Sequence, residues 1–351
     1  MNSLKKIKIA GYKSIEELEL DFHNLNILIG SNGAGKSNLL SFFEMLHAIN
    51  NSQFQNYVAA QGGANVLLYN GRKVTKRIAF SICDDRYQVY AHLNDKAGDQ
   101  LYFSKLGIQN DQDHHTLYAA DGLNELQNGR YAEYHTILDS IGVYHFHDTS
   151  TSSPMKSTAD IGDNIELAPD GRNVAAVLYR IKLTDISVYE RILSTIRLAA
   201  PYFQDFVLRE NPLNPQKIRL EWKKCGCDIP FGADQLSDGT LRFICLVVLL
   251  CLPEDMRKEV VLIDEPELGL HPFSITIITE LMKKYAESHQ VIAATQSVEF
   301  INEFQANQII VAESRNGASV FQRLDEKDLE DWLTDYSIGE LWKKNVIGGR
   351  P

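Results

Sequence analysis

Near its N-terminus the chain carries residue types suited to holding phosphate, Gly30-Ser31-Asn32-Gly33-Ala34-Gly35-Lys36-Ser37, followed by Asn38. The run fills the pattern G-x-x-x-x-G-K-[ST]. Its glycines let backbone N–H groups surround phosphate oxygens, and Lys36 directs a positive charge toward the outer phosphates. The hydroxyl of Ser37 suits a Mg²⁺ ion. A glycine-rich turn alone would not need Lys36 and Ser37, so we predict that this loop binds a nucleoside triphosphate.

Two carboxylates follow an apolar segment much further along the chain. Residues 260–263 are typical of a strand buried on both faces, and Asp264, Glu265 and Pro266 come directly after them. Asp264 suits Mg²⁺ or its water, and Glu265 suits a general base that deprotonates or orients an attacking water. A strand end followed by a turn would also explain this segment taken alone. Beside a phosphate loop, the pair predicts hydrolysis.

Between these motifs lies Leu236-Ser237-Asp238-Gly239-Thr240, followed by an apolar run to Leu252. Ser237 is suited to cap the N-terminus of a helix that is buried all round. An ordinary capped core helix would have the same sequence. Because a helix N-terminus attracts anions, Ser237 and the N–H of Gly239 are also candidates for contacts to a terminal phosphate.

The elements that must position these residues can be read from the hydrophobic pattern. The stretch 25–29 has strand length and precedes the phosphate loop, which therefore connects a strand to a helix. Further strands are expected over 77–83, 86–93, 217–224, 291–294 and 308–312, and helices over 174–181 and 186–198. The polar stretch 107–130 is expected to be a surface excursion.

The three motifs, in this order, resemble the ABC-type ATPase heads of the RecF, SMC and OLD kind. Residues 7–15 look like their first strand and turn, 267–272 (Glu-Leu-Gly-Leu-His-Pro) like their D-loop, and 294–297 like their switch segment. Residues 144–150 (Tyr-His-Phe-His-Asp-Thr-Ser), 170–173 and 348–351 look like a group of stand-alone prokaryotic AAA-type ATPases. The resemblance covers essentially the whole chain.

The resemblance implies an α/β fold, a P-loop ABC-type ATPase head of two lobes with a mixed central sheet, an antiparallel β layer and a short helical insertion. We expect residues 1–130 to form the nucleotide-binding lobe, 131–215 an inserted, mostly helical lobe, and 216–351 the second lobe. The 200 or so residues between Ser37 and Ser237 show no sustained heptads, so no long coiled coil is expected.

In such heads two protomers enclose two ATP molecules. The resemblance implies that Lys36, Ser37, Asp264 and Glu265 act on one nucleotide, while Ser237 and Gly239 contact the nucleotide of the partner. ATP binding would close a homodimer, or a higher oligomer, and hydrolysis would open it.

The chain departs from the family pattern at one position, and one family motif is not identified in it. Many such heads have a histidine at the switch position, whereas this chain has Gln296, which cannot carry charge. Slow or regulated turnover is the corresponding hypothesis. A Q-loop glutamine is not identified, since Gln53, Gln55 and Gln61 lie in no recognised segment.

Composition favours a cytoplasmic protein. The N-terminus has no apolar signal region, no apolar run is long enough for a membrane, and the five cysteines lack the spacing of a zinc site or disulfide framework. The net charge of −11 argues against a protein that is basic all over. Local basic stretches at 72–77 and 217–224 permit DNA contact, although a solvated sheet face explains the second equally well.

Two further clusters could bind metal. His145 and His147 lie at strand spacing beside Asp148, but the sequence offers no evident third ligand, so a polar strand end is the favoured interpretation. The acidic run 325–331 is interpreted as a solvated helix face rather than a nuclease centre. If nucleic acid is cut, we expect a separate protein to cut it.

Three functions are therefore compared. The favoured one is an ATPase that couples hydrolysis to DNA or to an effector or nuclease partner, in genome maintenance or antiphage defence. An ABC transporter ATPase subunit would need a Q-loop and a switch histidine. A slowly hydrolysing regulatory nucleotide-binding module has only Gln296 in its support, and the Asp264 and Glu265 pair argues against it.

Overall fold

A computed structural model of the chain describes residues 3–110, 114–118 and 132–350. These residues divide into two compact units. Unit 1 comprises the described parts of Met1–Val143, Lys258–Leu262 and His289–Pro351, and unit 2 comprises Tyr144–Arg257 and Ile263–Ser288. The three-part division expected from the sequence stays a prediction.

The first sheet of unit 1 is antiparallel between neighbouring strands, in the order β2-β1-β4-β5-β6-β7. Its strands are β1 (Lys6–Tyr12), β2 (Ile15–Asp21), β4 (Arg77–Cys83), β5 (Gln88–Lys96), β6 (Gln100–Gln109) and β7 (His114–Tyr118). Strand β4 has the predicted bounds. Part of the stretch expected as a polar excursion instead extends the sheet, since it completes β6 and forms β7; residues 111–113 and 119–130 of that stretch lie outside the described residues.

The second sheet is mixed and has the order β17-β16-β3-β15-β14-β8. It consists of β3 (Leu25–Ile29), β8 (Ile141–Tyr144), β14 (Val260–Asp264), β15 (Gln290–Thr295), β16 (Ile309–Arg315) and β17 (Ala318–Arg323). Strand β3 pairs in parallel with both β15 and β16, whereas β17 turns back antiparallel to β16. Every residue of β3 and β15 is buried, as continuous apolar strands between covering layers require.

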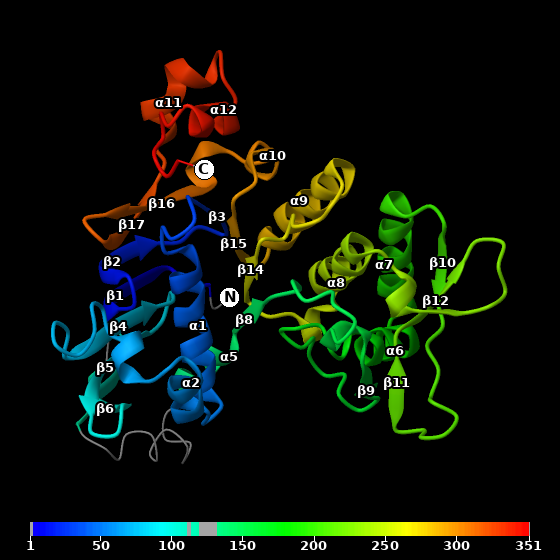
Figure 1. Cartoon of the computed structure of the whole chain (residues 1–351), viewed down its shortest axis with the longest axis horizontal. Helices are drawn as coiled ribbons and strands as arrows, with labels where there is room; N and C mark the ends of the chain where they lie inside the picture. The colour runs from blue at the N-terminus through cyan, green and yellow to red at the C-terminus, as the bar shows by residue number, and fades with distance from the viewer. Residues whose placement is uncertain (1–2, 111–113, 119–131, 351) are drawn as a thin grey trace. The chain divides into compact units, whose positions relative to one another are not determined.

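Helix α1 (Lys36–Asn50) shares one apolar core with residues of both sheets in unit 1. Figure 1 shows the course of this helix. Phe42 makes edge-to-face contacts with Tyr12 of β1 and Phe80 of β4, and the same core includes Ile292 and Ile310 of the mixed sheet. The other helices of this unit are α2 (Phe54–Ala60), α3 (Ala64–Leu67), α5 (Ala132–Asp139), α10 (Val298–Ile301), α11 (Glu326–Leu333) and α12 (Ile338–Lys343).

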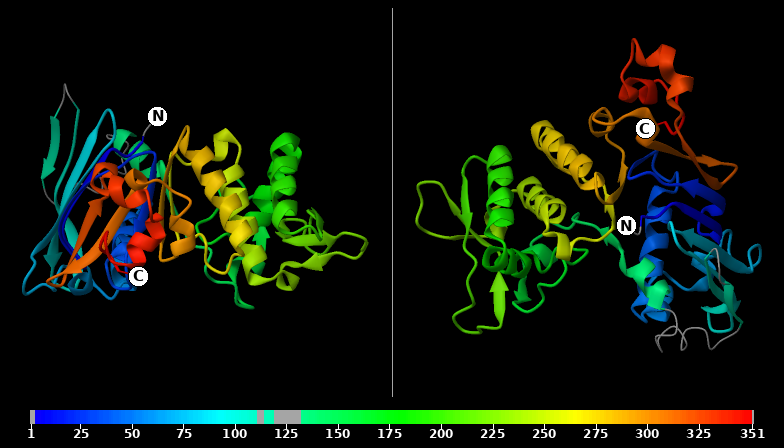
Figure 2. Two further views of the ribbon diagram at one scale, coloured as in Figure 1. Left: turned by 90° about the horizontal axis from the view of Figure 1, so that it is seen from above. Right: turned by 180° about the vertical axis from the view of Figure 1, so that it is seen from behind.

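Unit 2 is built on helices that lie side by side (Figure 2), namely α6 (Val174–Thr184), α7 (Ile186–Ala199), α8 (Asp238–Cys251) and α9 (Pro272–Ala286). Helix α8 is buried from Phe243 to Cys251, which confirms the helix expected after Ser237. Small sheets complete the unit: β10 (Phe203–Phe206), β12 (Glu221–Lys224) and β13 (Phe231–Gly232) form one, and β9 (Thr158–Asp160) and β11 (Lys217–Arg219) form another.

The expectation of one strand over 217–224 is wrong in one respect. Its alternating pattern is real, but the chain breaks at Leu220 and the two halves join different sheets. Periodicity identifies a strand without identifying its partner, which explains the error.

Two further expectations concern helices and cysteines. In the described part of the chain the longest helices, α1 and α9, have 15 residues each, far shorter than coiled-coil arms. No helix among the described residues combines the length and apolar character needed to cross a membrane. All five cysteines carry free thiols.

Candidate functional site

The predicted phosphate loop follows β3, the strand flanked on both sides by parallel neighbours. The register pairs Ile29 with Thr295 of β15 and with Val311 of β16. The loop therefore leaves the sheet at the carboxyl ends of adjacent parallel strands, where open α/β sheets bind ligands. Gln296, which follows β15 directly and is exposed, lies beyond the same edge.

The loop has the backbone that a phosphate site needs. Gly33 and Gly35 have φ values of +79° and +106°, in the region that favours glycine. A Cβ on Gly35 would collide with the hydroxyl of Ser319, whereas one on Gly33 would meet nothing within 4 Å. The loop is thus closely packed at its helix end and open at Gly33.

Lys36 begins α1 and is 7% exposed. Its ammonium group donates to the main-chain oxygen of Ser31 at 3.1 Å and also to that of Gly30. A buried cation directed into the loop, at the N-terminus of a helix, suits the charge of a phosphate chain. Ser37 is exposed, so its hydroxyl is accessible to an ion.

Asn38 has a structural contact in addition to its predicted role. Its amide donates to the Ser14 hydroxyl at 2.6 Å, and the Ser14 and Ser319 hydroxyls are themselves 2.6 Å apart. This chain of hydrogen bonds connects α1 to the turn between β1 and β2 and to β17. A nucleotide contact by Asn38 stays a prediction.

In unit 2, Asp264 is the last residue of β14 and Glu265 opens the following turn. Glu265 has a φ of +42°, an uncommon conformation for a non-glycine residue and one that concentrates at functional sites. Both side chains are partly exposed. The strand therefore presents two carboxylates at its end, as the sequence predicted.

Residues 236–240, which correspond to the signature segment of the ATPase heads that the chain resembles, confirm the predicted helix cap. The Ser237 hydroxyl accepts the N–H of Thr240 at 3.2 Å and so caps α8, and Ser237 is exposed. A Cβ on Gly239 would collide with the main-chain oxygen of Gly269. Only glycine at this position lets the first turn of α8 approach the segment after Glu265 so closely.

Arg242, which sequence reasoning missed, connects the parts of unit 2. Its guanidinium donates to the main-chain oxygens of Phe146 at 3.2 Å and His147 at 2.7 Å, and to that of Leu268 at 3.1 Å. A single side chain on α8 thus holds two loops. An isolated arginine in a run of apolar helix residues was the available signal.

The structure adds a candidate third ligand to the histidine pair, which the sequence did not show. One ring nitrogen from each of His145 and His147 and a carboxylate oxygen of Asp264 all lie within 4.8 Å of one another. Asp148, the neighbour considered from the sequence, instead accepts the N–H of Ser150 at 2.9 Å. Hydrogen bonds from Ser150 lower the pKa of Asp148. A third donor is therefore present, but it comes from a distant strand.

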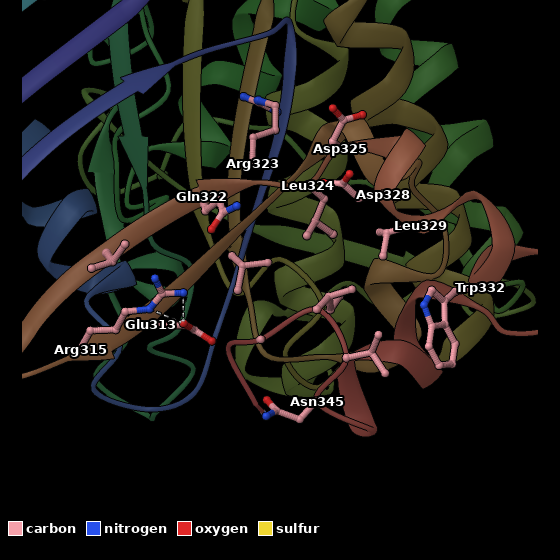
Figure 3. A pocket seen from close by; sticks show the side chains of 15 residues that line it. Glu313, Arg315, Gln322, Arg323, Leu324, Asp325, Asp328, Leu329, Trp332 and Asn345 are labelled. Atoms are coloured by element: carbon pink, nitrogen blue, oxygen red, sulfur yellow. Dashed lines mark hydrogen bonds and ion pairs between the residues drawn. The ribbon is translucent and has the colours of Figure 1, made fainter.

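A separate hollow of about 490 Å³ lies in unit 1 against β16, β17 and α11 (Figure 3). Asp325 and Asp328 line it together with Arg315 and Arg323, and none of the predicted nucleotide residues does. Leu329 of α11 is buried while its acidic neighbours are exposed. This agrees with a solvated helix face for the acidic run.

The fold and these motifs define a P-loop ATPase head of the ABC type. The chain belongs to the family described as "AAA domain, putative AbiEii toxin, Type IV TA system", whose model matches residues 25–302. This family and fold imply binding and hydrolysis of ATP, with Mg²⁺. No match was found among curated protein sequences.

Two solved structures are similar over nearly the whole chain. One is an Smc head bound to the C-terminal winged-helix domain of ScpA, with a TM-score of 0.64 and 16% identity, covering 93% of this chain and 99% of that one. The other is an Smc head with an extended coiled coil, bound to the C-terminal domain of ScpA and derived from Pyrococcus furiosus. Its TM-score is 0.60 and its identity 14%, over 95% and 99% of the chains. At these identities the similarity shows the fold.

Proposed function

We propose that this protein is a cytoplasmic Mg²⁺-dependent ATPase that dimerises around ATP and couples hydrolysis to an effector or DNA partner. The backbone N–H groups of residues 30–37 would hold the phosphates, with Lys36 supplying charge and Ser37 and Asp264 holding Mg²⁺. The ion would neutralise charge on the phosphates. Glu265 would orient and deprotonate water, and Gln296 would contact the terminal phosphate.

The observation that carries dimerisation is the exposed N-terminus of α8. Ser237 caps this helix and is open to solvent, although α8 is buried from Phe243 to Cys251. A capped helix N-terminus attracts anions. An exposed one can reach a nucleotide held by a second copy, which is the role that the family resemblance gives to Ser237 and Gly239.

An effector role is supported by the family description, which names a toxin and a type IV toxin–antitoxin system. The Smc heads with a similar fold were solved with a ScpA domain bound. Both observations favour a protein partner over free turnover. DNA contact remains part of the proposal through the basic stretch 72–77.

Light scattering after size-exclusion chromatography tests dimerisation. We expect the Glu265→Gln variant to be monomeric without nucleotide and dimeric with ATP and Mg²⁺, because it retains ATP. Adding Ser237→Arg should abolish the ATP-dependent dimer without weakening ATP binding. A Glu265→Gln protein that binds ATP and stays monomeric would contradict dimerisation.

Partner capture tests the coupling. Tagged Glu265→Gln is purified from its native cell with ATP, and Lys36→Ala serves as the matched control. A nuclease or toxin-like protein retained only by Glu265→Gln would support an effector complex, and DNA with repair proteins would support genome maintenance. A retained membrane protein would overturn the proposal in favour of transport.

A further inference from the structure

The cluster of His145, His147 and Asp264 offers two imidazole nitrogens beside a carboxylate oxygen. A site for Mg²⁺ alone would not require the nitrogens. Mg²⁺ prefers oxygen ligands in octahedral geometry, whereas imidazole nitrogen suits first-row transition ions. Two imidazoles lie beside Asp264, the carboxylate that the proposed function assigns to the metal ion. They therefore favour an ion that also accepts nitrogen ligands. We propose that His145 and His147 join Asp264 in binding a divalent transition ion of the Mn²⁺ type, which accepts both imidazole and phosphate oxygen.

The spacing of the donor atoms fits a shared ion. Two ligands about 2.1 Å from a metal lie about 3–4 Å apart. Here the three donor atoms lie within 4.8 Å of one another, and Nδ1 of His145 is 3.9 Å from Oδ2 of Asp264. Binding an ion would draw these three donor atoms closer together than they lie here.

The orientation of His147 is fixed by Asp264 itself. Its Nε2 lies 2.9 Å from the main-chain oxygen of Asp264, and only a protonated nitrogen can donate to a carbonyl. That hydrogen bond leaves the lone pair of the neutral ring on Nδ1. Metal-binding histidines characteristically use their second nitrogen to donate to a carbonyl or carboxylate.

The backbone of the histidine segment, residues 145–147, is held by hydrogen bonds to residues outside the cluster. The N–H of His145 donates to the oxygen of Pro169 at 2.9 Å, while Arg242 binds the carbonyls of Phe146 and His147. His145 and His147 are two residues apart, with ring centroids 6.1 Å apart. The segment is thus braced before any ion binds, which lowers the entropic cost of forming the site.

The inference rests on the proposed function only in assigning Asp264 to the ATPase ion. The experiment therefore measures metal binding by the full chain without nucleotide. Electron paramagnetic resonance follows the loss of the free Mn²⁺ signal, and pulsed measurements on the bound ion detect ¹⁴N from imidazole. We expect Mn²⁺ binding with ¹⁴N coupling that a large excess of Mg²⁺ does not remove.

Variants test each ligand. His145→Gln, His147→Gln and Asp264→Asn should each weaken Mn²⁺ binding about 10- to 100-fold or more, since loss of a supporting partner alone has that effect at metal sites. The control His92→Gln, in the antiparallel sheet of unit 1, should bind Mn²⁺ as the parent does. Asp148→Asn should also leave binding unchanged, and a loss there equal to that of Asp264→Asn would contradict this ligand set.

Wild-type spectra keep the test decisive even if a variant fails to fold. Bound Mn²⁺ without ¹⁴N coupling would overturn the inference. ATP binding is measured on the same preparations with Mg²⁺. Absent ¹⁴N coupling with intact ATP binding rejects the metal inference alone, and ¹⁴N coupling without ATP binding rejects the proposed ATPase alone.

Discussion

The guanidinium of Arg242 donates to the main-chain oxygen of His147 at 2.7 Å, although 95 residues separate them in sequence. Arg242 lies on α8, three residues after Gly239, so its bonds connect that helix directly to the segment His145–His147. Its additional bond to Leu268 extends the same connection to the D-loop. The hydrogen bonds of Arg242 therefore connect the signature segment to the residues around Asp264.

Arg242→Lys tests this connection. Lysine cannot reproduce the three directed bonds of a guanidinium. Because bonds from charged donors contribute about 1.5–3 kcal/mol each and these are partly exposed, we expect the free energy of unfolding to fall by roughly 1–3 kcal/mol. Urea denaturation measures it, with Arg197→Lys on α7 as the control. Unchanged stability together with unchanged turnover would refute the connection.

Lys36→Ala should lose most ATP binding. It removes a buried cation from a loop that we propose holds phosphates, and charge-assisted bonds to phosphate are among the strongest. We expect at least a tenfold weaker affinity, corresponding to about 1.4 kcal/mol. Titration calorimetry with ATP and Mg²⁺ provides the measurement. Lys96→Ala, at an exposed lysine, serves as the control. Equal ATP affinities of the two variants would show that the loop does not bind the phosphates of ATP.

Glu265→Gln should bind ATP normally and lose turnover. Glutamine keeps the size of the side chain but cannot accept a proton from water, and a general base contributes about 10²-fold or more. Phosphate release under saturating ATP measures the rate. The control variant Glu280→Gln makes the same chemical change on α9, away from the proposed site. Turnover of Glu265→Gln at the parental rate would exclude Glu265 from the mechanism.

Gln296→His tests whether the switch position limits turnover. A histidine can carry charge toward the terminal phosphate, which glutamine cannot. The exposed position beyond β15 accommodates the ring without repacking. We expect a faster steady-state rate with unchanged ATP affinity. A rate no higher than that of the parent would count against slow turnover set by Gln296.

Gly239→Ala should disturb the signature segment without touching the phosphate loop. The new methyl group would collide with the main-chain oxygen of Gly269, so α8 or the D-loop must shift. Overpacking of this kind costs about 1–3 kcal/mol. We expect lower thermal stability and loss of ATP-dependent dimerisation, with ATP binding by the monomer retained. A variant that dimerises like the parent would show that this close approach is dispensable.

Local sequence was sufficient wherever one segment contains the whole signal. Strand β3, the loop glycines, the capping of α8 by Ser237 and the carboxylates that end β14 all follow from short-range patterns. Propensity, capping and hydrophobic periodicity act over a few residues, so these features can be read without knowing the partners. The family match to residues 25–302 agrees with that reading.

The tertiary structure decided what these segments contact. His147 and Asp264 are 117 residues apart, and nothing in either segment specifies the other. The break at Leu220, the three bonds of Arg242 and the fit of Gly239 against Gly269 likewise depend on how distant elements pack. Packing selects partners through shape and buried area summed over many residues, which a single sequence segment does not encode. The sequence by itself thus indicated the phosphate-loop and carboxylate motifs, and the fold decided that two histidines lie beside Asp264.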